Sequence, residues 1–330
     1  MSGALRFGVI GGGAWGTALG QMLASSGDPV MLWAREPDVV ASINYDHENA
    51  VFLPGSPLSE SLSATDTLAD LDACEVLLVV TPAQHMRGVL DCLDGKGRPL
   101  ILCCKGMEAG TLMLMSEAAA EAQPDSPIAV LSGPTFAHEV AAGLPAAVTL
   151  ASAEDADAHR LARAIARPAF RPYVSTDVVG AEIGGAVKNV LAIACGVVEG
   201  AGLGQNARAA LISRGFAEMT RFGLAKGAHP ETLAGLAGLG DLVLTCTSTS
   251  SRNFSLGKGL GEGIAASELL GDRRTVAEGA YSAPVIQAAA RELCVEMPIV
   301  DAVNALLAGD ANVHAVVGSL LSRPLTSERR

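Results

Sequence analysis

The first half of the chain alternates short apolar runs with turns rich in Gly, Pro and polar residues. Continuous apolar runs of about four to eight residues are typical of strands that are buried on both faces of a parallel sheet. Such runs predict strands at 5–10, 29–33, 76–80, 100–103 and 128–131, and weaker ones at 146–150 and 170–174. An Ala- and Leu-rich helix is predicted after the first strand, ending near Ser26.

From Val178 onwards the pattern changes to long Ala-, Leu- and Gly-rich stretches with helical spacing. They predict helices at 182–199, 207–226, 231–236, 255–264, 282–292 and 298–308. We therefore predict an α/β protein in which a Rossmann-type parallel sheet (1–180) precedes an all-helical substrate-binding domain (181–330), with the boundary near Gly180.

The turn after the first strand reads GGGAWG, which places Gly11, Gly13 and Gly16 in the G-x-G-x-x-G spacing. Gly11 permits the tight turn, Gly13 lets backbone N–H groups approach a pyrophosphate, and Gly16 lets the helix pack closely on the strand. Because a strand precedes the motif and a helix follows it, the motif predicts dinucleotide binding.

The second strand ends in WARE, which leaves the choice between NADH and NADPH open. Arg35 is able to bind a 2′-phosphate, whereas Glu36 is the acidic type of residue that binds free ribose hydroxyls. We favour the phosphate role for Arg35 over a plain surface arginine, and therefore expect NADPH to be used.

Composition and charge exclude several classes of function. The net charge of −12 argues against nucleic acid as a partner, and a few local cations must bind any anionic substrate. The seven Cys show no metal-ligand spacing, so we expect reduced thiols and no metal. No charged-then-apolar leader precedes the first strand, and the longest apolar run, 190–198, is too short for a bilayer, so we expect a cytoplasmic protein without a membrane partner.

Lys188 lies inside the apolar stretch EIGGAVKNVL, where its ammonium would be costly to bury. On a helix it shares a face with the small residues Gly184 and Gly185, which leave room for a ligand. A lysine whose tip extends to solvent would fit the same pattern. Spacing alone does not decide between the two.

A second polar group lies in residues 235–257, where hydroxyl, guanidinium and amide groups follow a Gly-rich turn in one predicted loop: Asp241, Thr245, Ser251, Arg252 and Asn253. Arg beside hydroxyl and amide groups is typical of phosphate binding. A plain polar loop with a surface ion pair is equally compatible with the pattern. The stretch VAEG (276–279) indicates only a helix cap, and no His has a partner at a spacing that predicts a general base.

Taken in order, these stretches resemble the bacterial-type NAD(P)-dependent glycerol-3-phosphate dehydrogenases over about residues 5–310. The matching motifs are GGGAWGTAL, LWAR, CCKGME, LSGPTFAHEV, EIGGAVKNVLAIA, GQNARAALISRGFAEMTR, GLAGLGDLVLTCTS, SRN and VAEG. The chain departs from the family at Thr135, often Ser in relatives, and in the two Cys before Lys105, where small residues or Thr are more usual.

The resemblance implies a catalytic set in which Lys188 donates and accepts the proton at C2 of the substrate, Lys105 is a second cation, and Asp241 orients Lys188. It implies the following cofactor contacts: Gly11, Gly13, Ala14, Trp15, Gly16, Arg35, Lys105, Ala137, Arg252, Val276 and Glu278. It implies the following substrate contacts: Lys105, Gly133, Thr135, Lys188, Asn189, Asp241, Thr245, Ser251, Arg252 and Asn253.

On this interpretation the chain interconverts glycerol 3-phosphate and dihydroxyacetone phosphate with NAD(P), NADPH favoured, and supplies glycerol 3-phosphate for glycerophospholipid synthesis. Small apolar neighbours and the nearby cations are expected to lower the pKa of Lys188 toward neutrality. The apolar faces of the helical domain are compatible with a homodimer. Two alternatives stay open, a dehydrogenase of other β-hydroxyacids and a redox sensor that binds NADPH without turnover.

Overall fold

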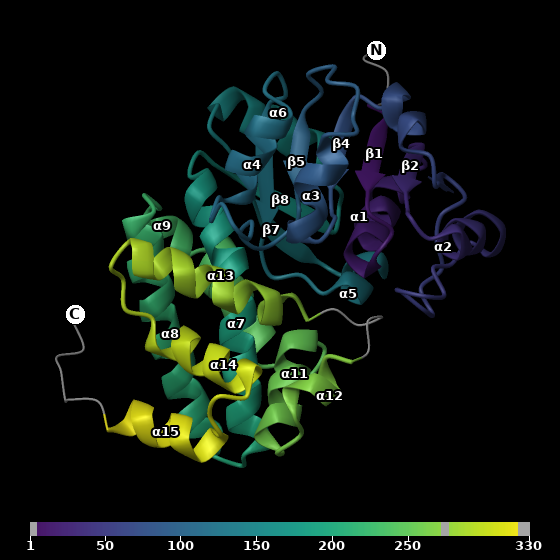
Figure 1. The fold of residues 1–330 in the computed structure, drawn as a ribbon. Coiled ribbons are helices and arrows are strands. Elements are labelled where there is room, and N and C mark those ends of the chain that lie inside the picture. Colours follow the sequence, from purple (N-terminus) through teal and green to yellow (C-terminus); the bar gives the residue numbers. More distant parts are fainter. Residues whose placement is uncertain (1–4, 272–276, 323–330) are drawn as a thin grey trace. The chain divides into compact units, whose positions relative to one another are not determined.

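The computed structural model describes residues 5–271 and 277–322, which form two compact units (Figure 1). Among the described residues, the first unit contains 5–185 and 226–241, and the second contains 186–225, 242–271 and 277–322. The predicted boundary near Gly180 therefore differs from the observed one. The helix that begins at Val178 starts in the first unit and ends in the second, and residues 226–241 return to the first.

The first unit is built on an eight-stranded sheet in the order β3-β2-β1-β4-β5-β6-β7-β8. The strands are β1 (Phe7–Ile10), β2 (Val30–Trp33), β3 (Leu62–Thr65), β4 (Val76–Val79), β5 (Leu100–Leu102), β6 (Ile128–Ser132), β7 (Ala146–Ser152) and β8 (Phe170–Ser175). The predicted Rossmann-type α/β fold is confirmed. All neighbouring pairs are parallel except β6–β7.

Two features of this sheet differ from the prediction. The chain reverses between β6 and β7, which pair antiparallel and are joined through the short helix α5 (Ala137–Ala141). Strand β3 escaped prediction because its sequence, LSAT, is short and weakly apolar. The side-chain amide of Asn44 bonds both the N–H and the carbonyl of Ala64 on this edge strand, at 2.8 and 2.9 Å.

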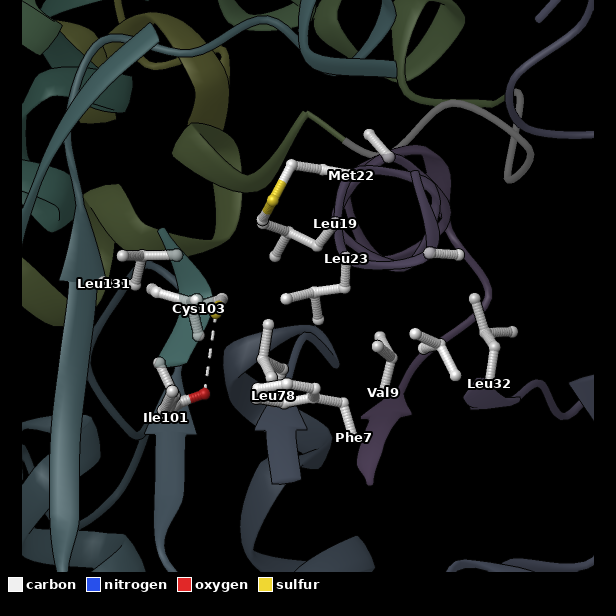
Figure 2. Packing of buried hydrophobic residues seen from close by; sticks show 14 of the residues in the cluster. Phe7, Val9, Leu19, Met22, Leu23, Leu32, Leu78, Ile101, Cys103 and Leu131 are labelled. Atoms are coloured by element: carbon white, nitrogen blue, oxygen red, sulfur yellow. Dashed lines mark hydrogen bonds between the residues drawn. The ribbon is translucent and has the colours of Figure 1, made fainter. Parts of the chain in front are cut away.

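Helices cover both faces of the sheet. Alternate strand residues point to opposite faces, so β1 sends Val9 into one core and Ile10 into the other. Helices α1 (Ala14–Ala24) and α6 (Asp155–Ile165) cover the first face, and α3 (Ala83–Leu90) and α4 (Met115–Ala122) cover the second. Figure 2 shows Leu19 and Leu23 of α1 directed at the strands. Each fully buried Leu contributes about 1.5–3 kcal/mol, which fixes α1 and its N-terminal glycine turn on the sheet.

The second unit is helical. Its helices are the C-terminal part of α7 (Val178–Gly200), α8 (Gln205–Ala225), α10 (Asp241–Cys246), α11 (Arg252–Gly261), α12 (Ala266–Leu269), α13 (Glu278–Glu292), α14 (Pro298–Ala308) and α15 (Val313–Leu321). Helices α7 and α11 approach closely, because a Cβ on Gly196 or Gly257 would overlap backbone carbonyls of the other helix. By length and composition α7 is able to cross a membrane, yet 89% of its most apolar window is buried in the protein, as in a core helix.

Residues 235–257 are not the single loop that the sequence predicted. They contain a π-helical turn η3 (Leu236–Gly240) after α9 (Pro230–Leu233), then α10 and the start of α11. A Cβ on Gly238 would overlap the carbonyl of Leu233, so the turn needs glycine. Glycine lowers helix propensity, which is why this helical stretch looked like a loop.

Candidate functional site

The glycine turn between β1 and α1 has the geometry of a nucleotide cradle. Gly11 has φ +127°, a Cβ on Gly16 would overlap the carbonyl oxygen of Gly11, and a Cβ on Gly12 would overlap the Cβ of Ala34. A Cβ on Gly13 would meet nothing within 4 Å, so this residue faces open space at the N-terminus of α1. Backbone N–H groups at such a helix terminus bind anions, and the turn therefore fits a dinucleotide pyrophosphate.

Around the turn, Ala14 and Trp15 open helix α1, and Ala137 opens α5. The indole Nε1 of Trp15 is buried without a hydrogen-bond partner among the described residues, as are Thr81 Oγ1 after β4 and Ser132 Oγ at the end of β6. A buried polar atom without a partner costs roughly 1–3 kcal/mol, and such atoms are typical of functional sites. All three lie at or just beyond the carboxyl ends of parallel strands, where α/β sheets bind ligands.

Lys105, which follows β5, forms an ion pair with Asp241 at the start of α10. The Lys105 ammonium donates to Asp241 Oδ2 at 2.6 Å, and Asp241 is fully buried. A Cβ on Gly185 would lie 3.3 Å from Lys105 Cγ and 3.2 Å from Ser132 Oγ. Because Gly185 has no side chain, the aliphatic stem of Lys105 packs closely against α7 at this position.

The chain after β6 adds Gly133 and Thr135. Gly133 has φ +154°, and a Cβ there would lie 2.9 Å from Val148 Cα on β7, so only glycine fits. The Thr135 hydroxyl donates to the Gly133 carbonyl at 3.2 Å. This contact holds the turn that follows the strand end.

In the second unit, Lys188 is 6% exposed on α7 and does not extend to solvent. Its ammonium donates to Thr245 Oγ1 of α10 at 3.0 Å, and Thr245 is buried too. Lys188 is thus a buried ammonium on an apolar helix, and buried ionisable groups are frequent at functional sites.

On α7, Lys188 follows Gly185 by three positions, and on α10 Thr245 follows Asp241 by four.

The other predicted contacts of the second unit lie around the start of α11. Ser251 caps this helix by accepting from the Phe254 N–H at 3.3 Å, and Arg252, its first residue, is exposed. Buried Asn253 accepts from the Gly279 N–H at 2.9 Å. A Cβ on Gly279 would lie 2.6 Å from the carbonyl oxygen of buried Asn189 on α7.

The VAEG stretch is only partly described. Glu278 opens α13, so the stretch does begin a helix. Val276 lies outside the described residues. Arg35, another predicted cofactor contact, follows β2. Its exposed guanidinium forms an ion pair with Glu36 Oε1 at 3.0 Å.

Some polar residues of this region were not predicted from the sequence. Ser132 was missed because the predicted strand ended one residue earlier. Asn49 was missed because it lies between β2 and β3, where no element was predicted, and its amide donates to the Gly12 carbonyl at 2.8 Å. The signal that was available for Asn49 is an isolated amide in an otherwise apolar and turn-forming stretch, which is weak.

Two buried carboxyl groups accept hydrogen bonds from the N-termini of neighbouring helices. Glu182 on α7 accepts from the N–H and hydroxyl of Ser116 on α4, and Glu218 on α8 accepts from the N–H groups of Ile299 and Val300 on α14. Burial raises the pKa of each to about 7, although these hydrogen bonds act in the opposite direction.

Nearly the whole chain is similar to known proteins. Family models for the N-terminus and the C-terminus of NAD-dependent glycerol-3-phosphate dehydrogenase match residues 6–158 and 177–318. A protein of Sphingopyxis alaskensis named glycerol-3-phosphate dehydrogenase (NAD(P)+) 1 is 65% identical over 323 residues, 98% of each chain. A protein of Erythrobacter litoralis with the corresponding name is 66% identical over 320 residues, 97% of each chain. The crystal structure of glycerol-3-phosphate dehydrogenase from Coxiella burnetii matches with a TM-score of 0.92 and 40% identity, over 97% of this chain and 99% of that one.

Proposed function

Because this chain belongs to the family of NAD-dependent glycerol-3-phosphate dehydrogenases, we propose that it interconverts sn-glycerol 3-phosphate and dihydroxyacetone phosphate with NAD(P) as the hydride carrier. The observation that carries the proposal is the buried Lys188 in a chain of this family.

The cofactor would be held at the glycine turn. We propose that the N–H groups of Gly13, Ala14 and Trp15 at the start of α1 bind the pyrophosphate, and that Arg35, two residues after β2, binds a ribose phosphate. When bound, NAD(P)H supplies the hydride that adds to C2 of the ketone. We propose that Ala137, Arg252, Val276 and Glu278 complete the cofactor contacts, and that Arg35 makes NADPH the favoured form.

Lys188 is the proposed acid in the reducing direction. As negative charge develops on the C2 oxygen, a buried ammonium stabilises it more strongly than it would in water. The ammonium then gives its proton to that oxygen, which leaves a neutral amine and the product hydroxyl. In the oxidising direction the amine removes the same proton. Thr245, which accepts from Lys188, holds the ammonium in place.

Lys105 and Asp241 are proposed to position the substrate and the proton donor. We propose that Lys105 brings a second positive charge near the C2 oxygen of the substrate. Asp241 forms an ion pair with Lys105 and so offsets the cost of burying that charge. Asn189 is proposed as a further polar contact of the substrate.

The substrate phosphate needs cations that act against a net charge of −12. Arg252 is exposed at the first position of α11, where the helix N-terminus adds to its attraction for an anion. We propose that Arg252, with Ser251, Asn253, Gly133 and Thr135, binds the phosphate and hydroxyl groups. Because this end does not react, its binding energy serves to fix C2 for hydride transfer.

We propose a cytoplasmic enzyme that supplies glycerol 3-phosphate for glycerophospholipid synthesis and that associates as a homodimer. The seven cysteines form no disulfide among the described residues, which fits a reducing compartment.

The direct test is nicotinamide absorbance in an assay with dihydroxyacetone phosphate and either NADPH or NADH. We expect turnover with both cofactors and a higher kcat/KM with NADPH. Activity on 3-hydroxy acids but not on the triose phosphate would instead establish a β-hydroxyacid dehydrogenase. Tight NADPH binding with no turnover of either substrate class would identify a sensor.

A further inference from the structure

The strongest unassigned feature of the first unit is a buried amide that contacts the glycine turn from outside the β1-α1 motif. Asn49 lies between β2 and β3 and is fully buried. One side-chain NH2 group donates to the Gly12 carbonyl oxygen at 2.8 Å and to the Thr17 hydroxyl at 2.8 Å. Its carbonyl oxygen accepts from the Phe52 N–H at 3.0 Å. The orientation of this amide is therefore fixed by both of its ends.

The contact with Gly12 controls a specific atom. The carbonyl of Gly12 and the N–H of Gly13 belong to one planar peptide unit, and this unit is trans. The N–H therefore points away from the carbonyl oxygen, so fixing one direction fixes the other. Asn49 holds the oxygen on the buried side, which turns the Gly13 N–H toward the open side of the turn.

The glycine turn needs a contact from outside the motif to fix its backbone conformation. Glycine samples more backbone conformations than other residues, and three consecutive glycines precede α1. Thr17 supports the same carbonyl, because its hydroxyl lies 3.4 Å from Gly12 O and accepts from the Asn49 amide. Asn49 itself is anchored by the Leu53 N–H, which donates to the Asn49 carbonyl at 2.9 Å, and Leu53 is buried in the core.

We propose that Asn49 is a positioning residue for the cofactor, which pre-orients the Gly13 N–H for the pyrophosphate. The inference rests on the proposed function, since it assumes that the glycine turn binds NAD(P). It assigns part of the affinity to the β2–β3 connection, which the G-x-G-x-x-G motif does not include. The ligand class is any dinucleotide or nucleotide that carries a diphosphate.

The chain offers a matched control. Asn44 lies in the same connection, and its side-chain amide makes two hydrogen bonds, both to Ala64 on the edge strand β3. Asn44→Ala therefore removes two amide hydrogen bonds from this segment, and Asn49→Ala removes three. Only Asn49 contacts the glycine turn, so only its loss is expected to weaken nucleotide binding.

The test measures Kd for NADPH, NADH, ADP-ribose and adenosine on the full chain, with the thermal midpoint beside it. We expect Asn49→Ala to raise Kd for the three diphosphate ligands by a common factor of about ten, as for the loss of one to two hydrogen bonds. Adenosine binding is expected to stay within about twofold, and so is kcat at saturating cofactor. For Asn44→Ala, every Kd is expected to stay within about twofold while the thermal midpoint falls.

Several results would overturn the inference. These are an unchanged Kd in Asn49→Ala, an equal loss for adenosine, or an equal loss in Asn44→Ala. If Asn49→Ala does not fold, the near-isosteric Thr17→Val removes one hydroxyl of the same network, and Kd for the diphosphate ligands is expected to rise about threefold; no change there would overturn the inference as well. If the wild-type protein binds no dinucleotide at all, the proposed function fails, which is a distinguishable outcome.

Discussion

The ammonium of Lys105 and the carboxylate of Asp241 lie 2.6 Å apart, although 136 positions separate them in the chain. The carboxylate is fully buried and the lysine side chain is 14% exposed. A charge pair of this kind is costly to form, and it is more costly to break by removing one partner than by removing both.

The first prediction concerns this pair. Lys105→Met leaves a buried carboxylate without its ion-pair partner and is expected to lower the free energy of unfolding by about 3 kcal/mol. The double variant Lys105→Met/Asp241→Asn is expected to recover about half of that loss, although it stays inactive. Urea unfolding of the wild-type protein, Lys105→Met, Asp241→Asn and the double variant measures these differences in unfolding free energy. A double variant as unstable as the single one would show that the pair is not the source of the loss.

The second prediction concerns proton transfer. Lys188→Met is expected to reduce kcat by about 10² to 10⁴, because it removes the acid and the charge that stabilises the developing alkoxide. Fold and cofactor affinity are expected to be retained, as measured by circular dichroism and NADPH binding. Lys258→Met is the matched control, since Lys258 is a half-exposed lysine of the second unit that pairs with Glu262. Turnover near the wild-type value in Lys188→Met would remove Lys188 from the chemistry.

A third prediction tests the hydroxyl that holds this lysine. Thr245→Val deletes the acceptor of the Lys188 hydrogen bond while keeping the side-chain shape, and kcat is expected to fall about tenfold through loss of one charged hydrogen bond. Thr245→Ser retains the hydroxyl and is expected to stay within about threefold of the wild-type enzyme. Equal activity of the two variants would mean that Thr245 contributes only packing.

The fourth prediction concerns phosphate recognition. Arg252→Ala is expected to raise KM for dihydroxyacetone phosphate about ten- to a hundredfold, the loss of one or two charge-assisted hydrogen bonds. Thermal stability should change little, because Arg252 is exposed. Arg160→Ala on α6, another exposed arginine, serves as the control. A KM equal to that of the control would place the phosphate elsewhere.

The fifth prediction follows from the pKa of Glu182, which burial raises from 4.5 to about 7. Between these values the folded chain keeps a proton that the unfolded chain has lost. The contribution to stability is therefore complete below pH 4.5 and is lost as the pH rises through 7. Wild-type unfolding free energy is expected to fall by roughly 3 kcal/mol more than that of Glu182→Gln across this window.

Chemical unfolding at several pH values measures this difference. Glu60→Gln, at an exposed carboxyl group, is the control and is expected to follow the wild-type curve. Glu218 contributes with the same sign, since burial also raises its pKa to about 7. Parallel curves for the wild-type protein and Glu182→Gln would contradict the assignment.

Much of the fold could be predicted from local pattern. The strands around Val9, Leu78 and Ile101 are continuous apolar runs, and both the glycine turn and the long apolar helix around Lys188 were visible in the sequence. Strand β3 and helix α10 were missed, because a short polar edge strand and a glycine-rich helical turn carry little local signal. The antiparallel direction of β7 was not predicted, because the composition of a strand carries no signal for the direction in which it pairs.

The sequence by itself determined the dinucleotide-binding motif, the family, and the residue types available for chemistry, because these depend on order and spacing along the chain. Only the tertiary structure decided which groups interact. Buried Lys188 donates to Thr245, Lys105 forms an ion pair with Asp241, and the Asn49 amide donates to the Gly12 carbonyl. The physical reason is that hydrogen bonds and ion pairs join groups that are near in space, and only packing of the whole chain brings such distant positions together.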